Sequence, residues 1–249
     1  MITTQRRGRV KKRRHALVTG GAVRLGQAIA LALAHRGMDV AIGYHRSRRE
    51  AATTVRQLTA AGARAVALRA DLADPRAAGR LVREAARALG GLDVLVNNAA
   101  VFVRTPLATT TPAAYDRPLD LNLRAAFFTS QAAAHTMECG HIVNVGDAGA
   151  TGAWPGYIPY TLSKAGVLAL TRALAVALRD RHIAVNCVAP GAVLRPAGFS
   201  RARWAAVTRG RPVRLEDVVA AVVYYATCPL SVTGRIRQVR GTTRSGGRR

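Results

Sequence analysis

Acidic residues, cysteines and aromatic side chains are all scarce in this chain of 249 residues. Aspartate and glutamate number 13 against 38 lysines and arginines, and aromatic residues make up 5%. The cysteines are three, Cys139, Cys187 and Cys228, and none forms a C-x-x-C pair. This pattern supports neither a disulfide framework nor a zinc site, so we expect no metal and a reducing, cytoplasmic location.

Long hydrophobic runs are also missing. The longest uncharged stretch near the C-terminus, residues 218–234, is broken by Thr227, Cys228, Pro229 and Ser231. It falls short of the roughly 20 apolar residues that span a bilayer. The apolar run at 16–23 follows basic residues but contains two glycines and is too short for a secretory signal. We therefore expect a soluble protein without a membrane segment.

The formal net charge of +25 is carried almost entirely by arginine, because only Lys11, Lys12 and Lys164 are lysines. Such a bias is typical of a genome's composition, and a nucleic-acid partner is not expected although the charge alone would allow one. The charge is partly concentrated at the two ends. Residues 1–14 and 242–249 are predicted to be basic, flexible tails.

What the chain has in quantity is apolar sequence, 49% of residues, in short runs that alternate with helical patterns. Continuous apolar runs indicate strands of a parallel sheet buried on both faces. Helix ends are marked by Gly37 and Gly62 and by the pairs Asp74-Pro75 and Thr111-Pro112. We predict one doubly wound α/β domain of the Rossmann type over residues 15–241, with helices on both faces of a mainly parallel seven-stranded sheet. The predicted strands are Ala16–Thr19, Asp39–Ile42, Ala65–Leu68, Asp93–Val96, Ile142–Val145, Ala184–Val188 and Ile236–Val239.

A glycine-containing turn follows the first predicted strand, in Thr19-Gly20-Gly21-Ala22-Val23-Arg24-Leu25-Gly26. Gly20 and Gly26 would allow a tight turn and a close approach of backbone N–H groups to a pyrophosphate at a helix N-terminus. After the second strand, an NAD site would carry an acidic residue, but the chain reads Tyr44-His45-Arg46-Ser47. A guanidinium and a hydroxyl suit a 2′-phosphate, so NADPH is favoured over NADH.

Four further features follow in order: Asn97-Asn98-Ala99-Ala100, Asn122, Asp147 and the pair Tyr160 and Lys164. A tyrosine and a lysine four residues apart share one helix face and can address the same ligand. A nearby ammonium lowers the pKa of a tyrosine from about 10, which favours proton exchange near neutrality. The spacing therefore indicates proton-transfer chemistry.

With these ordered motifs, and with Asn186 and Pro190-Gly191 after the sixth strand, the chain resembles the short-chain dehydrogenase/reductase family from His15 to about Gly241. The resemblance implies that Tyr160 exchanges the substrate proton, that Lys164 also holds the nicotinamide ribose and that Asn122 supports a water relay. The cofactor-binding residues it implies are Gly20, Arg24, Leu25, Gly26, His45, Arg46, Ser47, Asp71, Leu72, Asn98, Ala99, Lys164, Pro190 and Gly191.

Asp147 stands where this family normally has a serine, 13 residues before the tyrosine. A carboxylate suits a substrate with ring N–H groups better than a carbonyl oxygen. Arg24 in place of the middle glycine, the triplet His45-Arg46-Ser47 and Phe102 are similar to the pteridine reductase branch. That resemblance implies a pterin or dihydrofolate-like substrate, stacked by Phe102 against the nicotinamide and contacted by Arg24, Asp147 and Tyr160.

Several alternatives stay open from the sequence. A carbonyl or 3-oxoacyl-thioester reductase fits everything but Asp147, and a non-catalytic nucleotide-sensing or nucleic-acid-binding relative would explain the basic ends. Tyr157 stands seven residues before Lys164 and competes with Tyr160 for the catalytic role. Residues 193–211, with Phe199 and Trp204, are expected to form a mobile lid over the substrate.

A homo-oligomer, either a tetramer or a dimer, is expected from the family resemblance. The family's usual V-D-G-G turn near the C-terminus is replaced by Val239-Arg240-Gly241-Thr242. The replacement removes an acidic residue that typically supports subunit packing, so the subunit count stays open.

Overall fold

A seven-stranded sheet forms the centre of the molecule, with strand order β3-β2-β1-β4-β5-β6-β7 and every pair of neighbours parallel. The computed structural model describes residues 13–196 and 198–241. The sheet and its flanking helices confirm the predicted doubly wound fold, and all seven predicted strands are present. Their bounds are β1 His15–Val18, β2 Asp39–Tyr44, β3 Ala65–Arg69, β4 Val94–Asn97, β5 Gly140–Val145, β6 Ile183–Pro190 and β7 Ile236–Val239.

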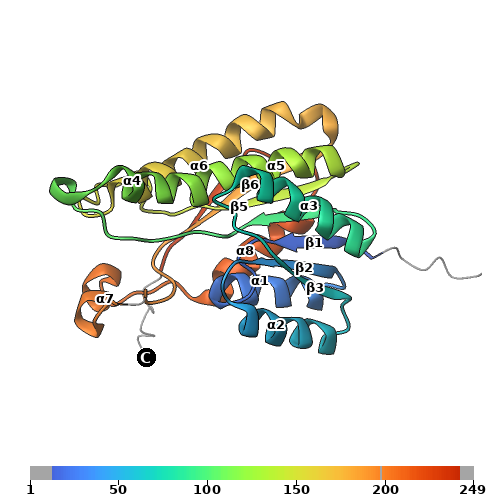
Figure 1. Cartoon of the computed structure of the whole chain (residues 1–249), viewed down its shortest axis with the longest axis horizontal. Coiled ribbons are helices and arrows are strands. Elements are labelled where there is room, and N and C mark those ends of the chain that lie inside the picture. Colours follow the sequence, from blue (N-terminus) through green and yellow to red (C-terminus); the bar gives the residue numbers. More distant parts are fainter. Residues whose placement is uncertain (1–12, 197, 242–249) are drawn as a thin grey trace, which may run out of the picture.

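Helices cover both faces of the sheet (Figure 1). One apolar cluster packs α1, α2 and α8 against the sheet, and a second cluster packs α3, α5 and α6 against the opposite face. The α-helices are α1 Arg24–His35, α2 Arg48–Ala60, α3 Pro75–Leu89, α4 Pro112–Pro118, α5 Ala125–Thr136, α6 Ile158–Ala177, α7 Arg201–Thr208 and α8 Leu215–Thr227. Shorter turns are η1 Leu107–Thr109, the π-helical η2 Leu119–Arg124 and η3 Arg179–Arg181.

The helix ends follow from local chemistry. Asp74 accepts a hydrogen bond from the N–H of Arg76 at the start of α3, and Thr111 accepts one from the N–H of Ala114 at the start of α4. Each cap is followed by a proline, which lacks the N–H that a first helical residue would leave unpaired. Gly37 and Gly62 have φ of +79° and +83° just after α1 and α2, which a residue with a Cβ adopts only at a cost.

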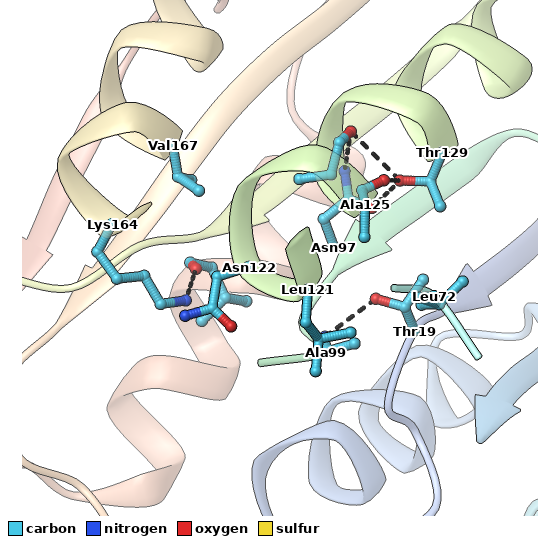
Figure 2. A pocket seen from close by; sticks show the side chains of 12 residues that line it. Thr19, Leu72, Asn97, Ala99, Leu121, Asn122, Ala125, Thr129, Lys164 and Val167 are labelled. Carbon is cyan, nitrogen blue, oxygen red and sulfur yellow. Dashed lines mark hydrogen bonds between the residues drawn. The ribbon is translucent and has the colours of Figure 1, made fainter. Parts of the chain in front are cut away.

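The strands are not wholly apolar, because asparagines lie at the centre of the sheet. The Asn97 Nδ2 donates to Asn144 Oδ1 at 2.9 Å. Thr129 Oγ1 donates to Asn97 Oδ1 at 2.7 Å, as Figure 2 shows. Asn144 Nδ2 in turn donates to Thr171 Oγ1 at 2.9 Å. These bonds join β4 and β5 to α5 and α6, so a satisfied polar network fixes how two helices sit on the sheet near its carboxyl edge.

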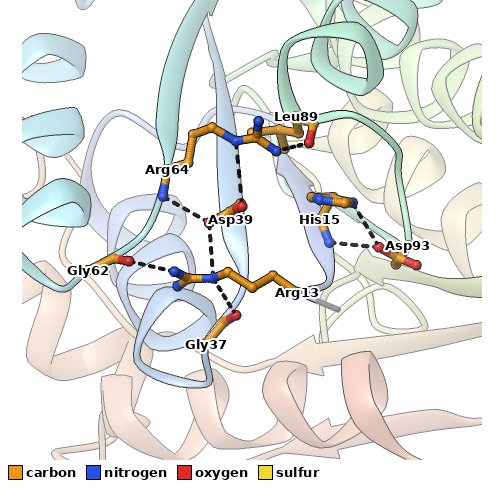
Figure 3. A network of polar contacts seen from close by, with 8 residues as sticks. All are labelled: Arg13, His15, Gly37, Asp39, Gly62, Arg64, Leu89 and Asp93. Carbon is orange, nitrogen blue, oxygen red and sulfur yellow. Dashed lines mark hydrogen bonds and ion pairs between the residues drawn. The ribbon is translucent and has the colours of Figure 1, made fainter. Parts of the chain in front are cut away.

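Two residues of the predicted N-terminal tail are anchored to the domain. The Arg13 guanidinium donates to the carbonyls of Gly37 and Gly62 and pairs with Asp39 at 3.2 Å (Figure 3). Arg14 donates to the Ala226 carbonyl. These two residues therefore pack on the domain, because their guanidiniums bind backbone carbonyls and the buried carboxylate of Asp39. The rest of the predicted tails, residues 1–12 and 242–249, lies outside the described residues.

Within the described ranges, no helix has the length and apolar character needed to cross a bilayer.

Candidate active site

A cavity of about 330 Å³ lies where the loops after β1, β2, β3 and β4 meet, at the carboxyl edge of the sheet. The loop after β1 is shaped for close approach. Gly20 has φ of +62°, and a Cβ at Gly26 would collide with the Gly20 carbonyl oxygen and lie 2.6 Å from Asn98 Nδ2. Only glycine fits at both positions, which leaves a cradle of bare backbone at the start of α1.

Asn98 fixes this loop from the neighbouring strand. Its Nδ2 donates to the carbonyls of Thr19 and Gly20, and Thr19 Oγ1 accepts from the backbone N–H groups of Asn98 and Ala99. The cradle is therefore rigid before any ligand enters, which reduces the entropy that binding must overcome.

Most of the expected cofactor residues line this cavity: Gly20, Arg24, Leu25, Gly26, His45, Asp71, Leu72, Asn98 and Ala99. Arg46 and Ser47 lie just past its rim, Arg46 as an exposed side chain and Ser47 as the residue preceding α2. Pro190 ends β6, and the Gly191 N–H donates to the Val239 carbonyl. Lys164 lines a neighbouring pocket that shares Ala99 with this cavity.

Arg24 begins α1 with φ of +54°, in the left-handed region. A non-glycine residue there is strained by about 1 kcal/mol or more. Its guanidinium lines the cavity and donates to the carbonyls of Leu194 and Arg195, both at 3.2 Å. The arginine that replaces the family's middle glycine thus ties the cofactor loop to the segment after β6.

Asn122 lies in the π-helical turn η2, an irregularity that is common at functional sites. Its Oδ1 accepts from the Val101 N–H at 2.8 Å, and its Nδ2 donates to the Val101 carbonyl at 3.1 Å and to Ser163 Oγ at 3.0 Å. Asn122 therefore connects the chain after β4 to helix α6, on which Tyr160 and Lys164 stand.

Lys164 and Asn122 point into one small pocket, together with Thr19, Ala99 and Leu121 (Figure 2). The Lys164 Nζ donates to the Val145 carbonyl at 2.8 Å, and the residue is 5% exposed. Burial lowers the pKa of this ammonium, and the charge of Asp147 partly opposes the shift. The pocket volume is about 10 Å³, close to the space that one water molecule requires.

Asp147 follows β5 and faces Tyr160. Tyr160 Oη donates to Asp147 Oδ2 at 2.6 Å, while Asp147 Oδ1 accepts from the Gly149 N–H, also at 2.6 Å. Both carboxylate oxygens are thereby engaged, and one of them is held against the phenol.

The pKa of Tyr160 is shifted in the direction opposite to the expected one. Burial, then the charge of Asp147 and its hydrogen bond, raise it well above the ordinary value of 10. The expected lowering by Lys164 is not seen, because burial and the neighbouring carboxylate both disfavour the phenolate. Tyr160 is consequently held as a neutral phenol that donates a hydrogen bond to Asp147.

Phe102 packs among aromatic side chains near the site. It stacks on Tyr157 with ring centroids 4.4 Å apart and planes 6° apart, and it meets Tyr160 edge-on at 4.7 Å. The contacts with Tyr157 and Tyr160 explain how Phe102 is fixed near the site, whereas its expected stacking on a substrate stays a prediction.

Tyr157 and Tyr160, the two candidates for the catalytic role, have different hydrogen-bond partners. Tyr157 accepts a hydrogen bond from Arg203 at 2.8 Å, whereas Tyr160 contacts Asp147. The geometry favours Tyr160 at the reacting centre. Sequence reasoning missed Trp154, Arg104 and Arg203 around Tyr157, since isolated aromatic and basic residues in loops carry no periodic signal.

Comparison with known proteins gives consistent matches. The family model described as short chain dehydrogenase matches residues 14–204. Hydroxynaphthalene reductase-like protein Arp2 of Metarhizium brunneum is 36% identical over 218 residues, which are 86% of this chain and 80% of that protein. The 3-oxoacyl-(acyl-carrier-protein) reductase FabG of Staphylococcus aureus is 36% identical over 189 residues, 74% of this chain and 76% of that protein.

A solved short chain dehydrogenase from Burkholderia cenocepacia, in complex with NADP, is similar throughout. It is 37% identical, superposes with a TM-score of 0.86, and the match covers 92% of this chain and 96% of that one. None of these three relatives is named as a pteridine reductase. The comparison therefore supports membership of the family but not of the pteridine reductase branch. The chain belongs to the short-chain dehydrogenase/reductase family of oxidoreductases.

Proposed function

We propose that the protein is an NADPH-dependent reductase of a flat, nitrogen-containing ring with a C=N bond, of the pterin or dihydrofolate type. The observation that carries this proposal is the hydrogen bond from Tyr160 to Asp147 at 2.6 Å. A carboxylate at this position accepts N–H groups, and a ketone oxygen offers none.

The cofactor part of the proposal rests on the glycine cradle and the surrounding side chains. A pyrophosphate would accept from the backbone at the start of α1, where a Cβ at Gly26 would close the space. Arg46, exposed just past the end of β2, would reach a 2′-phosphate. A reduced nicotinamide bound there would supply the hydride.

The chain's own residues would complete the reaction by delivering a proton. Hydride addition to the carbon of C=N leaves a pair of electrons on nitrogen, which takes a proton from Tyr160 Oη, the phenol that is hydrogen-bonded to Asp147. Lys164 would stabilise the charge left on the phenolate. The one-water pocket beside Asn122 and Lys164 would return the proton from solvent.

Arg24 connects this site to residues 193–211, which we propose cover the bound substrate. The carbonyls of Leu194 and Arg195 are held by its guanidinium. A lid anchored at the cofactor loop would exclude water when both ligands are bound.

A second candidate is the reduction of a polycyclic aromatic ketone. The relative named for hydroxynaphthalene reduction favours it, as do the aromatic side chains Phe102, Trp154 and Tyr157 that lie together near Tyr160. In that case Asp147 would have to be protonated to donate to the ketone oxygen.

The deciding experiment is an NADPH oxidation panel with dihydrobiopterin, dihydrofolate, a hydroxynaphthalene-type ketone and an acetoacetyl thioester. Pterin turnover that Tyr160→Phe abolishes supports the first candidate. The variant Asp147→Ser restores the family's usual residue and is expected to lower pterin turnover at least tenfold while raising ketone turnover. Wild-type activity on ketones alone would move the assignment to the second candidate.

A further inference from the structure

A second cavity, of about 410 Å³, lies beyond Tyr157 and is lined by Arg104, Trp154, Tyr157, Phe199 and Arg203 among others. It is separate from the proposed cofactor cavity and shares no lining residue with it. It combines aromatic side chains with two arginines, a combination that neither hydride nor proton transfer requires.

This cavity is one aromatic layer away from the reacting group. Phe102 contacts both groups, meeting Tyr160 edge-on and stacking on Tyr157. Trp154 completes the wall, with its ring 5.8 Å from that of Tyr157 and 6.0 Å from that of Phe102. A ring-containing substrate held at Tyr160 would therefore extend a substituent toward Trp154 and Tyr157.

Arg203 is oriented before any ligand binds. Its guanidinium donates to Tyr157 Oη at 2.8 Å and stacks over the Phe199 ring with its Cζ 4.0 Å from the centroid. These contacts use one face and one N–H of the guanidinium, which leaves other donors of its fixed fork for a ligand. Holding the side chain in place lowers the entropy cost of binding an anion.

Arg104 lies across the same cavity, against Gly156. A Cβ at Gly156 would lie 3.7 Å from Arg104 Nε, so the arginine side chain packs directly over this glycine. Within the part of the chain that the structure describes, neither Arg104 nor Arg203 has a carboxylate within 4.0 Å. Two guanidiniums beside an aromatic wall form a recognition site for an aryl group that carries an anion.

We propose that this cavity binds a carboxylate-bearing aryl substituent of the substrate, with Trp154 and Tyr157 contacting the aryl ring and Arg104 and Arg203 binding the carboxylate. The inference rests on the proposed reduction of a ring at Tyr160, and it narrows that substrate class to rings with an anionic tail. A carboxylate accepts two parallel N–H bonds from a guanidinium.

The test measures binding of the substituent alone, so that it does not depend on turnover. Isothermal titration of the full chain uses N-(4-aminobenzoyl)-L-glutamate, which has the aryl ring and two carboxylates but no reducible heterocycle. Its diamide is the neutral comparison. At low salt we expect the dianion to bind at least tenfold more tightly than the diamide.

Substitutions test whether the preference for the dianion over the diamide arises in this cavity. Arg104→Gln and Arg203→Gln should each lower the preference for the dianion about fivefold, the double variant should remove it, and Arg203→Lys should keep part of it. Arg201→Gln is the matched control, because it removes one exposed arginine from the same helix outside the lining. It should leave both affinities within twofold.

Three results would overturn the proposal: equal affinity for dianion and diamide, an equal loss in Arg201→Gln and Arg203→Gln, or a double variant that keeps the preference. The second of these would show general attraction to a chain of charge +25. If the protein binds the dianion as expected but reduces no pterin, the proposed subsite is supported and the proposed reaction is refuted. The two failures are therefore distinguishable.

Discussion

At the scale of single residues, the protonation of Tyr160 is set by its neighbours. Burial comes first, and the carboxylate of Asp147 adds to it, because a negative charge disfavours a phenolate beside it. A tyrosine that donates a proton must stay neutral, so both causes extend the pH range over which it can act. The family's serine would exert no such charge effect.

The first prediction concerns the pH profile. Since the Tyr160 pKa is raised well above 10, kcat/KM should show no alkaline fall from this group up to pH 10. Asp147→Asn removes the carboxylate charge but leaves the burial, so the Tyr160 pKa should drop and any alkaline fall should begin at a lower pH than in the wild type. Stopped-flow NADPH oxidation between pH 6 and 10.5 checks this. Identical alkaline limbs in both proteins would contradict the proposed coupling.

The second prediction concerns Arg46. Its guanidinium is expected to pair with a 2′-phosphate, a charge-assisted bond worth about 1.5–3 kcal/mol. Arg46→Ala should weaken NADPH binding at least tenfold and NADH binding less than twofold, as measured by quenching of protein fluorescence. Arg49→Ala, an exposed arginine in α2, is the control. Equal losses for both cofactors would remove the assigned role.

At the scale of elements, the buried amides decide how α5 and α6 sit on the sheet. Asn97, Asn144 and Thr171 are each 8% exposed or less and satisfy one another. The sequence shows these residues inside apolar runs but does not show their pairing, because Asn97, Asn144 and Thr171 come from three different elements.

The third prediction is that Asn144→Ala destabilises the fold by about 1–3 kcal/mol, because it removes one acceptor of the Asn97 amide and leaves Thr171 Oγ1 without its donor in a buried site. Thr171→Val removes a partner but keeps the shape, so it should cost about 1–2 kcal/mol. Urea unfolding gives both values. A loss under 0.5 kcal/mol for Asn144→Ala, the size of an ordinary surface change, would show that the network carries little energy.

At the scale of the whole molecule, one buried histidine joins three distant segments. His141 in β5 accepts at Nδ1 from Arg14 at 2.9 Å, and its Nε2 contacts the Cys228 carbonyl at 2.8 Å. A guanidinium only donates, so the ring must be neutral and protonated at Nε2. Burial lowers the pKa of His141 below its ordinary 6.5.

The fourth prediction follows from that shift. The folded protein binds a proton at His141 less readily than the unfolded chain does. The contribution of neutral His141 to the free energy of unfolding is therefore complete above about pH 7, and it is lost as pH falls from about 6.5 toward the lowered pKa. Between pH 7.5 and 5.5 the free energy of unfolding should fall by about 1 kcal/mol more in the wild type than in His141→Gln. His135→Gln, an exposed histidine in α5, should keep the wild-type dependence, and a parallel pH dependence in His141→Gln would refute the assignment.

The fifth prediction concerns self-association. Phe127, Tyr115 and Leu162 are at least 40% exposed on α5, α4 and α6, and Phe127 lines a surface hollow with Leu123 and Leu170. We expect this apolar surface to be covered by a second copy of the chain. Phe127→Glu should lower the mass measured by light scattering, and Thr53→Glu on α2 should not. A wild-type monomer at micromolar concentration would contradict the expected oligomer.

The sequence by itself determined the fold, the glycine cradle and the order of the chemical residues. Hydrophobic periodicity, helix caps and turn glycines are local properties of the sequence. When all of them agree, they favour a single arrangement that buries the strands. The spacing of Asp147, Tyr160 and Lys164 also identified them as candidate site residues.

Only the tertiary structure decided how these groups act on one another. The direction of the Tyr160 pKa shift, the binding of Lys164 to the Val145 carbonyl and the stacking of Phe102 on Tyr157 depend on burial and on side chains from separate loops. Electrostatic effects fall with distance and with solvent screening, and neither quantity is encoded in residue spacing. For the same reason the arginine pair beside Trp154 became visible only once the chain was folded.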